Sequence, residues 1–354
     1  MKTSAMVSLI VMAPLIAAAA ASAGHSQPPA AVSAAAARPT LAVQKTEEGQ
    51  TVIYDAYTWR RRELAKRLPL FEPWPSESAI GASFKRFGLD AAPMPETIPI
   101  PSRIMGDVYL VNAEPNLTYL IDAGSGQLVL IDPGIERNVE SILQKVTALG
   151  FSPKDIKWVI NTHAHYDHSM ADAHFQRLGA KTLVGRDDVY AVEKGTEATA
   201  KFALPAAENA HYPTLHVDWP VDDGERLVLG NKTFLAIHTP GHTDGSTCYM
   251  LQMGGKTILF GGDTILFDYR LGAQGSPFAD DVAYLASLKK LQAFGGYFRW
   301  DALLPGHGTM VLDRAYLDVL KGERQVQLDV VEGAPVQALP FATDAYRKLM
   351  FGRP

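Results

Sequence analysis

A cluster of three histidines and an aspartate within six residues is the feature that most constrains this chain. The segment from residue 161 to residue 168 reads NTHAHYDH, and it holds three of the 10 histidines in 354 residues. The apolar run IKWVIN, residues 156 to 161, stands directly before the first of them and predicts a β-strand. The cluster is therefore expected on the loop beyond the carboxyl end of that strand.

The residue types in this cluster point to a metal. His163, His165 and Asp167 alternate, so in an extended loop their side chains leave on one side, while His168 points elsewhere. Two ligand sets can thus come from one short segment. Imidazole and carboxylate groups suit Zn²⁺ better than Mg²⁺ or Ca²⁺, and three protein ligands with an open position are typical of catalytic zinc.

Three further residues of the metal-binding types follow predicted strands downstream. His242 lies in IHTPGHT, Asp263 lies in LFGGDT and His307 lies in LLPGHG. Each comes after an apolar run and beside glycine, a setting that random placement would seldom produce. Together with the cluster they provide enough side chains for two metal ions.

Two successive β-rich series, each followed by helices, predict an α/β protein with two stacked sheets flanked by helices. The first series begins at Arg103 with runs such as DVYLVNA and QLVLIDPG, and the second begins near Glu225 with ERLVLG. Helices are expected near residues 136–149, 171–178, 187–193, 281–294 and 314–322.

Over roughly residues 103–312 the chain resembles the metallo-β-lactamase superfamily. The H-x-H-x-D-H loop, the TPGHT histidine, the Gly-Asp after a strand and the PGHG histidine occur in the order of that family. The resemblance implies an αβ/βα four-layer sandwich of two mixed sheets, with two Zn²⁺ ions between the sheet edges. It implies a first zinc on His163, His165 and His242, a second on Asp167, His168 and His307, a bridging Asp263, and Asp132 bracing the metal loop.

The resemblance also implies a zinc-dependent hydrolase, in which a metal-bound hydroxide attacks a carbonyl carbon and Asp167 handles its proton. The signal peptide described below, FEPW, DVYLVN and NTHAHYDHS are similar to the secreted third subclass of metallo-β-lactamases. Opening of a β-lactam amide is therefore the first interpretation. That subclass usually has serine at the positions of Asp263 and Ile265, and a bridging aspartate is familiar in glyoxalase-type thioesterases and lactonases. Hydrolysis of lactones or (thio)esters is the alternative, and an iron-dependent persulfide dioxygenase is the second alternative.

The N-terminal segment predicts export. Lys2 precedes an apolar run that ends in Ala21-Ser22-Ala23, which is typical of a secretory signal peptide cleaved after Ala23. We therefore expect a periplasmic or secreted protein with no membrane span after cleavage. The predicted organisation is a signal peptide (1–23), a disordered linker (24–50), an N-terminal extension with one helix at about 54–68 (51–102), a catalytic domain (103–325) and a C-terminal tail (326–354).

Composition limits the partners. The net charge is −5 and like charges form no long block, so nucleic acid is not an expected partner. The single cysteine, Cys248, excludes an intrachain disulfide, and its apolar context predicts a buried strand residue. The expected partner is a small molecule with a cyclic amide or ester. Its specificity is expected in the loop after VNAEPN and in residues 195–219 and 265–280, and the oligomeric state is not predicted.

Overall fold

The computed structural model describes residues 40–45, 49–54, 56–69, 75, 79–94, 97–196, 212–265 and 280–315. The predicted signal peptide, the first part of the predicted linker and the predicted C-terminal tail lie outside these residues. So do residues 197–211 and 266–279, which fall in two of the three segments where specificity is expected.

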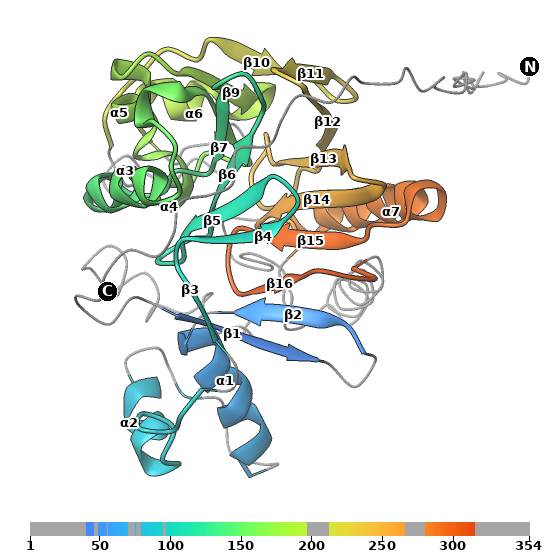
Figure 1. Ribbon diagram of the computed structural model, residues 1–354. Coiled ribbons are helices and arrows are strands. Elements are labelled where there is room, and N and C mark those ends of the chain that lie inside the picture. The colour runs from blue at the N-terminus through green and yellow to red at the C-terminus, as the bar shows by residue number, and fades with distance from the viewer. Residues whose placement is uncertain are drawn as a thin grey trace, which may run out of the picture. The chain divides into compact units, whose positions relative to one another are not determined.

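Two mixed β-sheets form the centre of the described chain (Figure 1). The nine-stranded sheet has the order β11-β12-β13-β14-β15-β16-β2-β1-β3, and the seven-stranded sheet has the order β10-β9-β8-β7-β6-β5-β4. Four neighbouring pairs are parallel, namely β7 with β8, β8 with β9, β9 with β10, and β14 with β15. The strands of the nine-stranded sheet are β1 (Thr40–Lys45), β2 (Thr51–Tyr54), β3 (Thr97–Pro99), β11 (Arg226–Leu229), β12 (Lys232–His238), β13 (Thr247–Met253), β14 (Lys256–Gly262), β15 (Ala302–Pro305) and β16 (Thr309–Val311). Those of the seven-stranded sheet are β4 (Ser102–Met105), β5 (Val108–Asn112), β6 (Thr118–Asp122), β7 (Leu128–Ile131), β8 (Ile156–Asn161), β9 (Lys181–Gly185) and β10 (Trp219–Val221).

Alternation of side chains along the strands explains how the layers stack. In β7, Val129 and Ile131 pack in the core between the two sheets, whereas Leu128 and Leu130 pack in the core beneath the helices. Strands β13 and β14 of the other sheet alternate in the same way between the central core and the core under α7. Because successive residues of a strand face opposite sides, strands buried on both faces read as continuous apolar runs.

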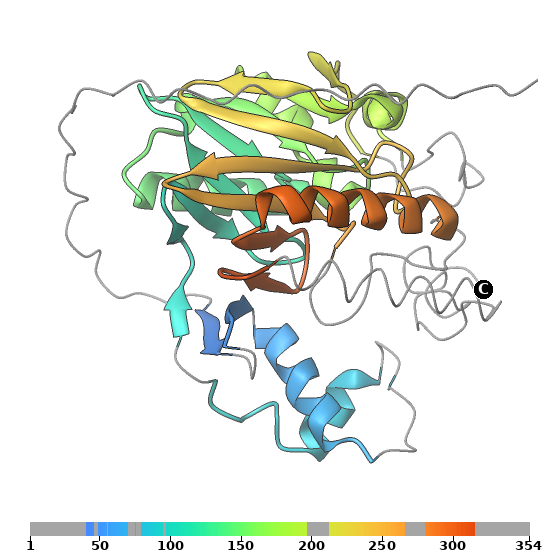
Figure 2. The same ribbon diagram turned by 90° about the vertical axis from the view of Figure 1, so that its right-hand side faces the viewer.

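Helices cover the outer faces of both sheets. The helix α7 lies along the outer face of the nine-stranded sheet (Figure 2), and α3 and α5 pack on the seven-stranded sheet. This arrangement confirms the predicted sandwich of two stacked mixed sheets flanked by helices. The helices are α1 (Ala56–Arg67), α2 (Ile80–Arg86), α3 (Val139–Ala148), α4 (Tyr166–Ser169), α5 (Asp172–Arg177), α6 (Val189–Lys194) and α7 (Asp281–Phe298), with 3-10 turns η1 (Glu136–Asn138), η2 (Pro153–Asp155) and η3 (Arg186–Asp188).

The N-terminal region corrects two expectations. Residues 40–45, placed in the disordered linker, form β1, because Leu41 and Ala42 are fully buried and the strand pairs with both β2 and β3. The N-terminal extension is predicted to hold one helix, yet besides α1 it contains a second helix, α2, and the strand β3. The helix fits because residues 76–92 contain no proline. The extension joins the catalytic fold through pairing of β2 with β16.

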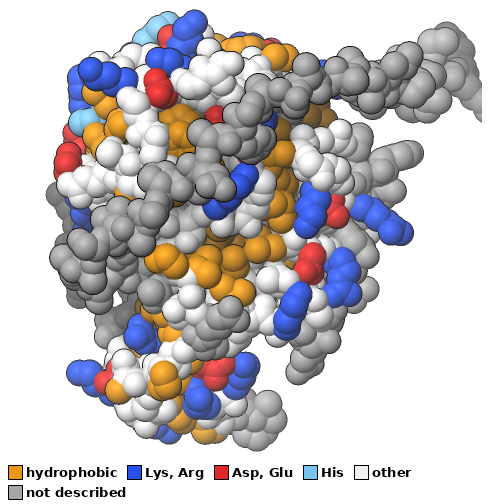
Figure 3. Space-filling view, in the orientation of Figure 1, with side chains coloured by type: hydrophobic (Ala, Val, Ile, Leu, Met, Phe, Trp, Pro, Cys, Tyr) orange, Lys and Arg blue, Asp and Glu red, His pale blue; other side chains and the backbone are white. Residues whose placement is uncertain are grey.

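The described surface carries charges of both signs. Figure 3 shows hydrophobic side chains gathered near the middle of one face, with Lys, Arg, Asp and Glu side chains interspersed around them. Among the described residues, none of the helices combines the length and the apolar character that crossing a membrane requires.

Candidate metal centre

The histidine cluster lies where the sequence predicts, directly beyond the carboxyl end of β8. Its local conformation differs from the expected extended loop. The backbone is extended up to His165 and then forms the helical turn α4 from Tyr166 to Ser169. The turn separates Asp167 from His163 and His165, so the expectation that all three side chains share one side is wrong for Asp167. The alternation argument holds only while the backbone stays extended.

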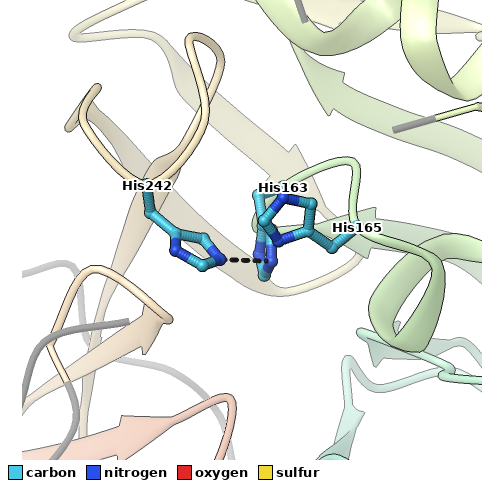
Figure 4. A group of neighbouring side chains, drawn as sticks. All are labelled: His163, His165 and His242. Atoms are coloured by element: carbon cyan, nitrogen blue, oxygen red, sulfur yellow. Dashed lines mark hydrogen bonds between the residues drawn. The ribbon is translucent and has the colours of Figure 1, made fainter. Parts of the chain in front are cut away.

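Three histidines from two loops form the first group. His163 and His165 come from the loop after β8, and His242 comes from the loop after β12 (Figure 4). The Nε2 atoms of His163 and His242 are 3.1 Å apart, and one ring nitrogen from each of the three lies within 4.8 Å of the others. His163 and His242 are buried and His165 is partly exposed, so this group is accessible from the side of His165.

A second group combines Asp167, His168 and His307. The Nε2 atom of His307 lies 3.1 Å from Asp167 Oδ2 and 3.1 Å from His168 Nε2. His307 follows β15, so this group also joins a loop of each sheet. The side chains of Asp167 and His307 are 19% and 21% exposed, so solvent reaches this group.

Asp263 lies between the two groups. Its Oδ1 atom is 3.5 Å from His168 Nε2, and its Oδ2 atom is 3.6 Å from His242 Nε2 and 3.5 Å from His307 Nε2. Asp263 Oδ1 is buried without a hydrogen-bond partner among the described residues. A buried carboxylate oxygen needs a compensating partner, and a cation between these groups would provide it. The donor set therefore fits two metal ions.

Asp132 supports the cluster from behind. One of its oxygens, Oδ2, lies 2.9 Å from His168 Nδ1 and accepts the Thr162 hydroxyl at 2.7 Å, while Oδ1 accepts the Thr162 N–H at 2.8 Å. Since His168 Nδ1 faces this carboxylate, Nε2 is directed to the cluster. The opposite ligand is fixed similarly, because His307 Nδ1 donates to the Pro115 carbonyl at 2.7 Å.

Glycine at position 306 allows the close approach of these groups. A Cβ atom on Gly306 would lie 2.6 Å from His168 Cε1 and would also collide with Asp263 Oδ1. The glycine beside the predicted ligand His307 is thus a steric requirement of the cluster.

Burial and neighbouring charges lower the pKa of some histidines of the centre and raise that of another. Burial lowers the pKa of His163 well below its usual value and lowers that of His165 to about 4, so both imidazoles are neutral at pH 7. Burial also disfavours charged His168, but Asp167, Asp263 and Asp132 outweigh it and raise the pKa to about 10. The pKa of the Asp167 carboxyl falls despite burial because His168 and His307 face it. Neutral imidazole and ionised carboxylate are the states that bind metals, so a metal ion bound by the second group would displace the proton of His168.

Two supporting residues escape prediction from the sequence. Asp188 accepts hydrogen bonds from the loops of both histidine segments, and the Tyr284 hydroxyl in α7 donates to the Asp263 carbonyl at 2.6 Å. From the sequence, Asp188 is predicted only to begin a helix, and Tyr284 is predicted only to lie on the apolar side of one. No local pattern marks either residue, because their partners lie far away along the chain.

Cys248, His238 and His216 are of metal-binding types but lie outside the candidate centre. Cys248 is fully buried in β13, which confirms its predicted burial. His238 ends β12 and its Nε2 lies 2.7 Å from the Asp244 carbonyl, and His216 is 82% exposed beside Glu193. Among the described residues, neither His238 nor His216 belongs to the first or the second ligand group. His211 lies outside the described residues.

A family model for the metallo-beta-lactamase superfamily matches residues 111–296, just over half of the 354 residues. The chain belongs to the metallo-beta-lactamase superfamily. Members of this superfamily typically hold two zinc ions and act on small molecules such as β-lactams and thioesters. Membership explains why the candidate ligands converge from both halves of the sandwich.

Individual relatives differ in the reactions that their names describe. A probable metallo-hydrolase of Methanocaldococcus jannaschii is 30% identical over 183 residues, which are 51% of this chain and 83% of that protein. An acyl-coenzyme A thioesterase of Gallus gallus is 26% identical over 200 residues, 53% of this chain and 70% of its own. A solved subclass B3 metallo-beta-lactamase with an active-site glutamic acid has a TM-score of 0.54 at 24% identity, covering 75% of this chain and 98% of that one. That structure shares the fold.

Proposed function

We propose that the chain is a secreted dinuclear zinc hydrolase that cleaves the acyl bond of a small carbonyl substrate. The observation that carries the proposal is the position of Asp263, whose oxygens lie within 3.6 Å of ring nitrogens from both groups. Zinc bound there would lower the pKa of a bound water towards neutrality and so supply a nucleophile at neutral pH.

The residues of the chain have distinct roles in this proposal. His163, His165 and His242 hold the first ion, and the second is held by Asp167, His168 and His307. Asp132 keeps His168 oriented through Nδ1. Asp167 is the proton acceptor, because its carboxylate is ionised and partly exposed beside His307 in the second group.

We favour a lactone or thioester as the substrate. A carboxylate at position 263 resembles the bridging aspartate of glyoxalase-type thioesterases and lactonases, whereas secreted third-subclass lactamases usually have serine there. A relative named as an acyl-coenzyme A thioesterase aligns with 53% of the chain, which supports the same class. The bridging contacts of Asp263 are the specific observation in favour of this choice.

A β-lactam is the second candidate substrate. The segments DVYLVN and NTHAHYDHS and the predicted signal peptide favour it, since they are similar to the secreted lactamases. If Asp263 is what excludes β-lactams, then Asp263→Ser should raise turnover of a chromogenic cephalosporin relative to the unmodified enzyme. An unchanged or lower lactam rate would show that position 263 does not set this specificity.

One parallel assay separates the two classes. The purified mature protein is offered an acyl-homoserine lactone, an acyl-coenzyme A thioester, a chromogenic cephalosporin and a carbapenem. We expect turnover of the lactone or the thioester. Turnover of the lactams alone would reverse the order of the two candidates, and no turnover of any of the four would contradict the proposed function.

Removal of one predicted ligand should abolish whichever activity is found. We expect His165→Ala to lower the rate by about 100-fold or more, because loss of a ligand exceeds the effect of losing an outer partner. His216→Ala is the matched control, since His216 is exposed and lies outside the ligand groups. Full activity of His165→Ala would refute the zinc assignment.

Two further measurements test the remaining parts of the proposal. N-terminal sequencing of the periplasmic protein should begin at Gly24 if the predicted signal peptide is removed. Metal analysis should find zinc, whereas one iron per chain with oxygen consumption would support the persulfide dioxygenase alternative instead.

A further inference from the structure

A buried carboxylate connects two loops of the candidate centre without reaching the metal positions. Asp188 ends η3, directly after β9, and is fully buried. Its Oδ2 atom accepts the Ala164 N–H at 2.9 Å and the Thr243 hydroxyl at 2.6 Å, and its Oδ1 atom accepts the Gly245 N–H at 2.9 Å. Both oxygens are therefore used, and all three donors are neutral.

The donors flank the first histidine group. Ala164 stands between His163 and His165, and Thr243 directly follows His242. The two loops come from different sheets, so no hydrogen bond of either sheet ladder sets their separation. Asp188 contacts both loops. Together with the Thr247 N–H, which donates to the Thr162 carbonyl at 2.9 Å, it holds the three imidazoles at their spacing.

Close packing around the carboxylate shows that this contact is built into the fold. A Cβ atom on Gly245 would lie 2.6 Å from Asp188 Cβ, and a Cβ atom on Gly185 would lie 2.6 Å from Thr247 Oγ1 and would also collide with the Gly245 carbonyl. Gly185 and Gly245 thus allow the segment that carries Asp188 to pack closely against the turn after His242.

We propose that Asp188 is a positioning residue, which holds the loops of His163, His165 and His242 at the spacing that binds the first metal ion. This inference rests on the proposed dinuclear zinc site. Its consequence is specific: a change at Asp188 weakens the first metal position and leaves the second, formed by Asp167, His168 and His307, at its original affinity.

Asp188→Asn is a sharp test because it preserves size. Whichever way the amide is oriented, its NH₂ group meets either the Gly245 N–H or the Ala164 N–H, so one backbone donor loses its acceptor. One loop must then move. Outer partners of metal ligands typically contribute 10–100-fold to metal affinity, and we expect a loss of about that size at the first position.

The experiment titrates the metal-free full-length mature chain with Zn²⁺ against a chromophoric chelator. His165→Ala and His307→Ala identify which of the two affinities belongs to which position. Asp187→Asn is the matched control, since its side chain is the neighbouring carboxylate, is 59% exposed and contacts His238. Thermal unfolding of the metal-free proteins separates local from global effects.

The expected result is a weaker first affinity in Asp188→Asn, an unchanged second affinity and wild-type binding in Asp187→Asn. Wild-type affinities in Asp188→Asn would overturn the inference, and so would an equal loss at both positions with a lower unfolding temperature. If Asp188→Asn fails to fold, Thr243→Val, which removes one donor and keeps the carboxylate, should still weaken the first position selectively. Absence of zinc binding by the wild-type chain would instead overturn the proposed function and the inference with it.

Discussion

At the scale of single residues, the candidate centre depends on carboxylates that orient histidines as much as on the histidines themselves. Asp132 contacts both Thr162 and His168, and it adopts a left-handed φ of 50° that L-residues seldom occupy. Such a conformation persists only where the surroundings enforce it, and the hydrogen bonds of this carboxylate do so.

Asp132→Asn should weaken the second metal position. The amide cannot accept all three contacts of the carboxylate, so His168 loses its fixed orientation. We expect about a 10–100-fold lower zinc affinity at that position, measured by chelator competition. Asp90→Asn, at an exposed position in the N-terminal extension, is the control, and equal affinities in the two variants would show that Asp132 does not orient His168.

Cys248 should be chemically inert in the folded protein. Burial raises the pKa of its thiol to about 11, so the reactive thiolate is scarce at pH 7 to 9. Because the thiolate fraction grows only as pH approaches the pKa, labelling by a disulfide reagent should be negligible over this range. It should become complete in denaturant, and rapid labelling of the native protein at pH 8 would contradict the burial of this residue.

At the scale of helices and strands, the sequence predicts those elements whose secondary structure is set by their own residues and does not depend on pairing with distant strands. The apolar run Ile156–Asn161 indicates a strand by itself, and the sequence of α3 has the apolar spacing of an amphipathic helix. Both elements are therefore predicted correctly. The strand β1 is different. Its sequence TLAVQK is short and partly polar, and it becomes a strand because β2 and β3 pair with it on both sides.

The contribution of β1 can be measured by truncating a buried side chain. Leu41 is fully buried in the central core, so Leu41→Ala should lower the free energy of unfolding by about 2–5 kcal/mol. Val228 in β11 is 65% exposed, so Val228→Ala should change the free energy of unfolding by less than about 0.5 kcal/mol. Urea unfolding of the two variants gives both values. Equally small changes in the free energy of unfolding would show that residues 40–45 do not contribute to the core and would support the predicted linker instead.

At the scale of the whole described fold, the centre is assembled across the two sheets. The seven-stranded sheet supplies the loop after β8, and the nine-stranded sheet supplies His242, Asp263 and His307 after β12, β14 and β15. The identity of these residues could be predicted, because each follows an apolar strand and accompanies glycine. The tie through Asp188 could not, because it exists only once the sheets have stacked.

This assembly couples metal binding to stability. An ion held from both sheets binds the folded chain better than the unfolded chain, so excess Zn²⁺ should raise the unfolding temperature. Chelation should lower it again. An unfolding temperature that does not respond to zinc would contradict a centre that spans the sandwich.

Metal content and hydrolytic rate, measured on the same samples, show whether the protein works through a dinuclear zinc centre. The purified mature protein is analysed for metals and assayed on the substrate that it turns over, before chelation, after chelation and after return of Zn²⁺. We expect two zinc ions per chain, loss of activity when they are removed and recovery when they are returned. Full activity in the metal-free protein, or a single iron per chain, would contradict this expectation.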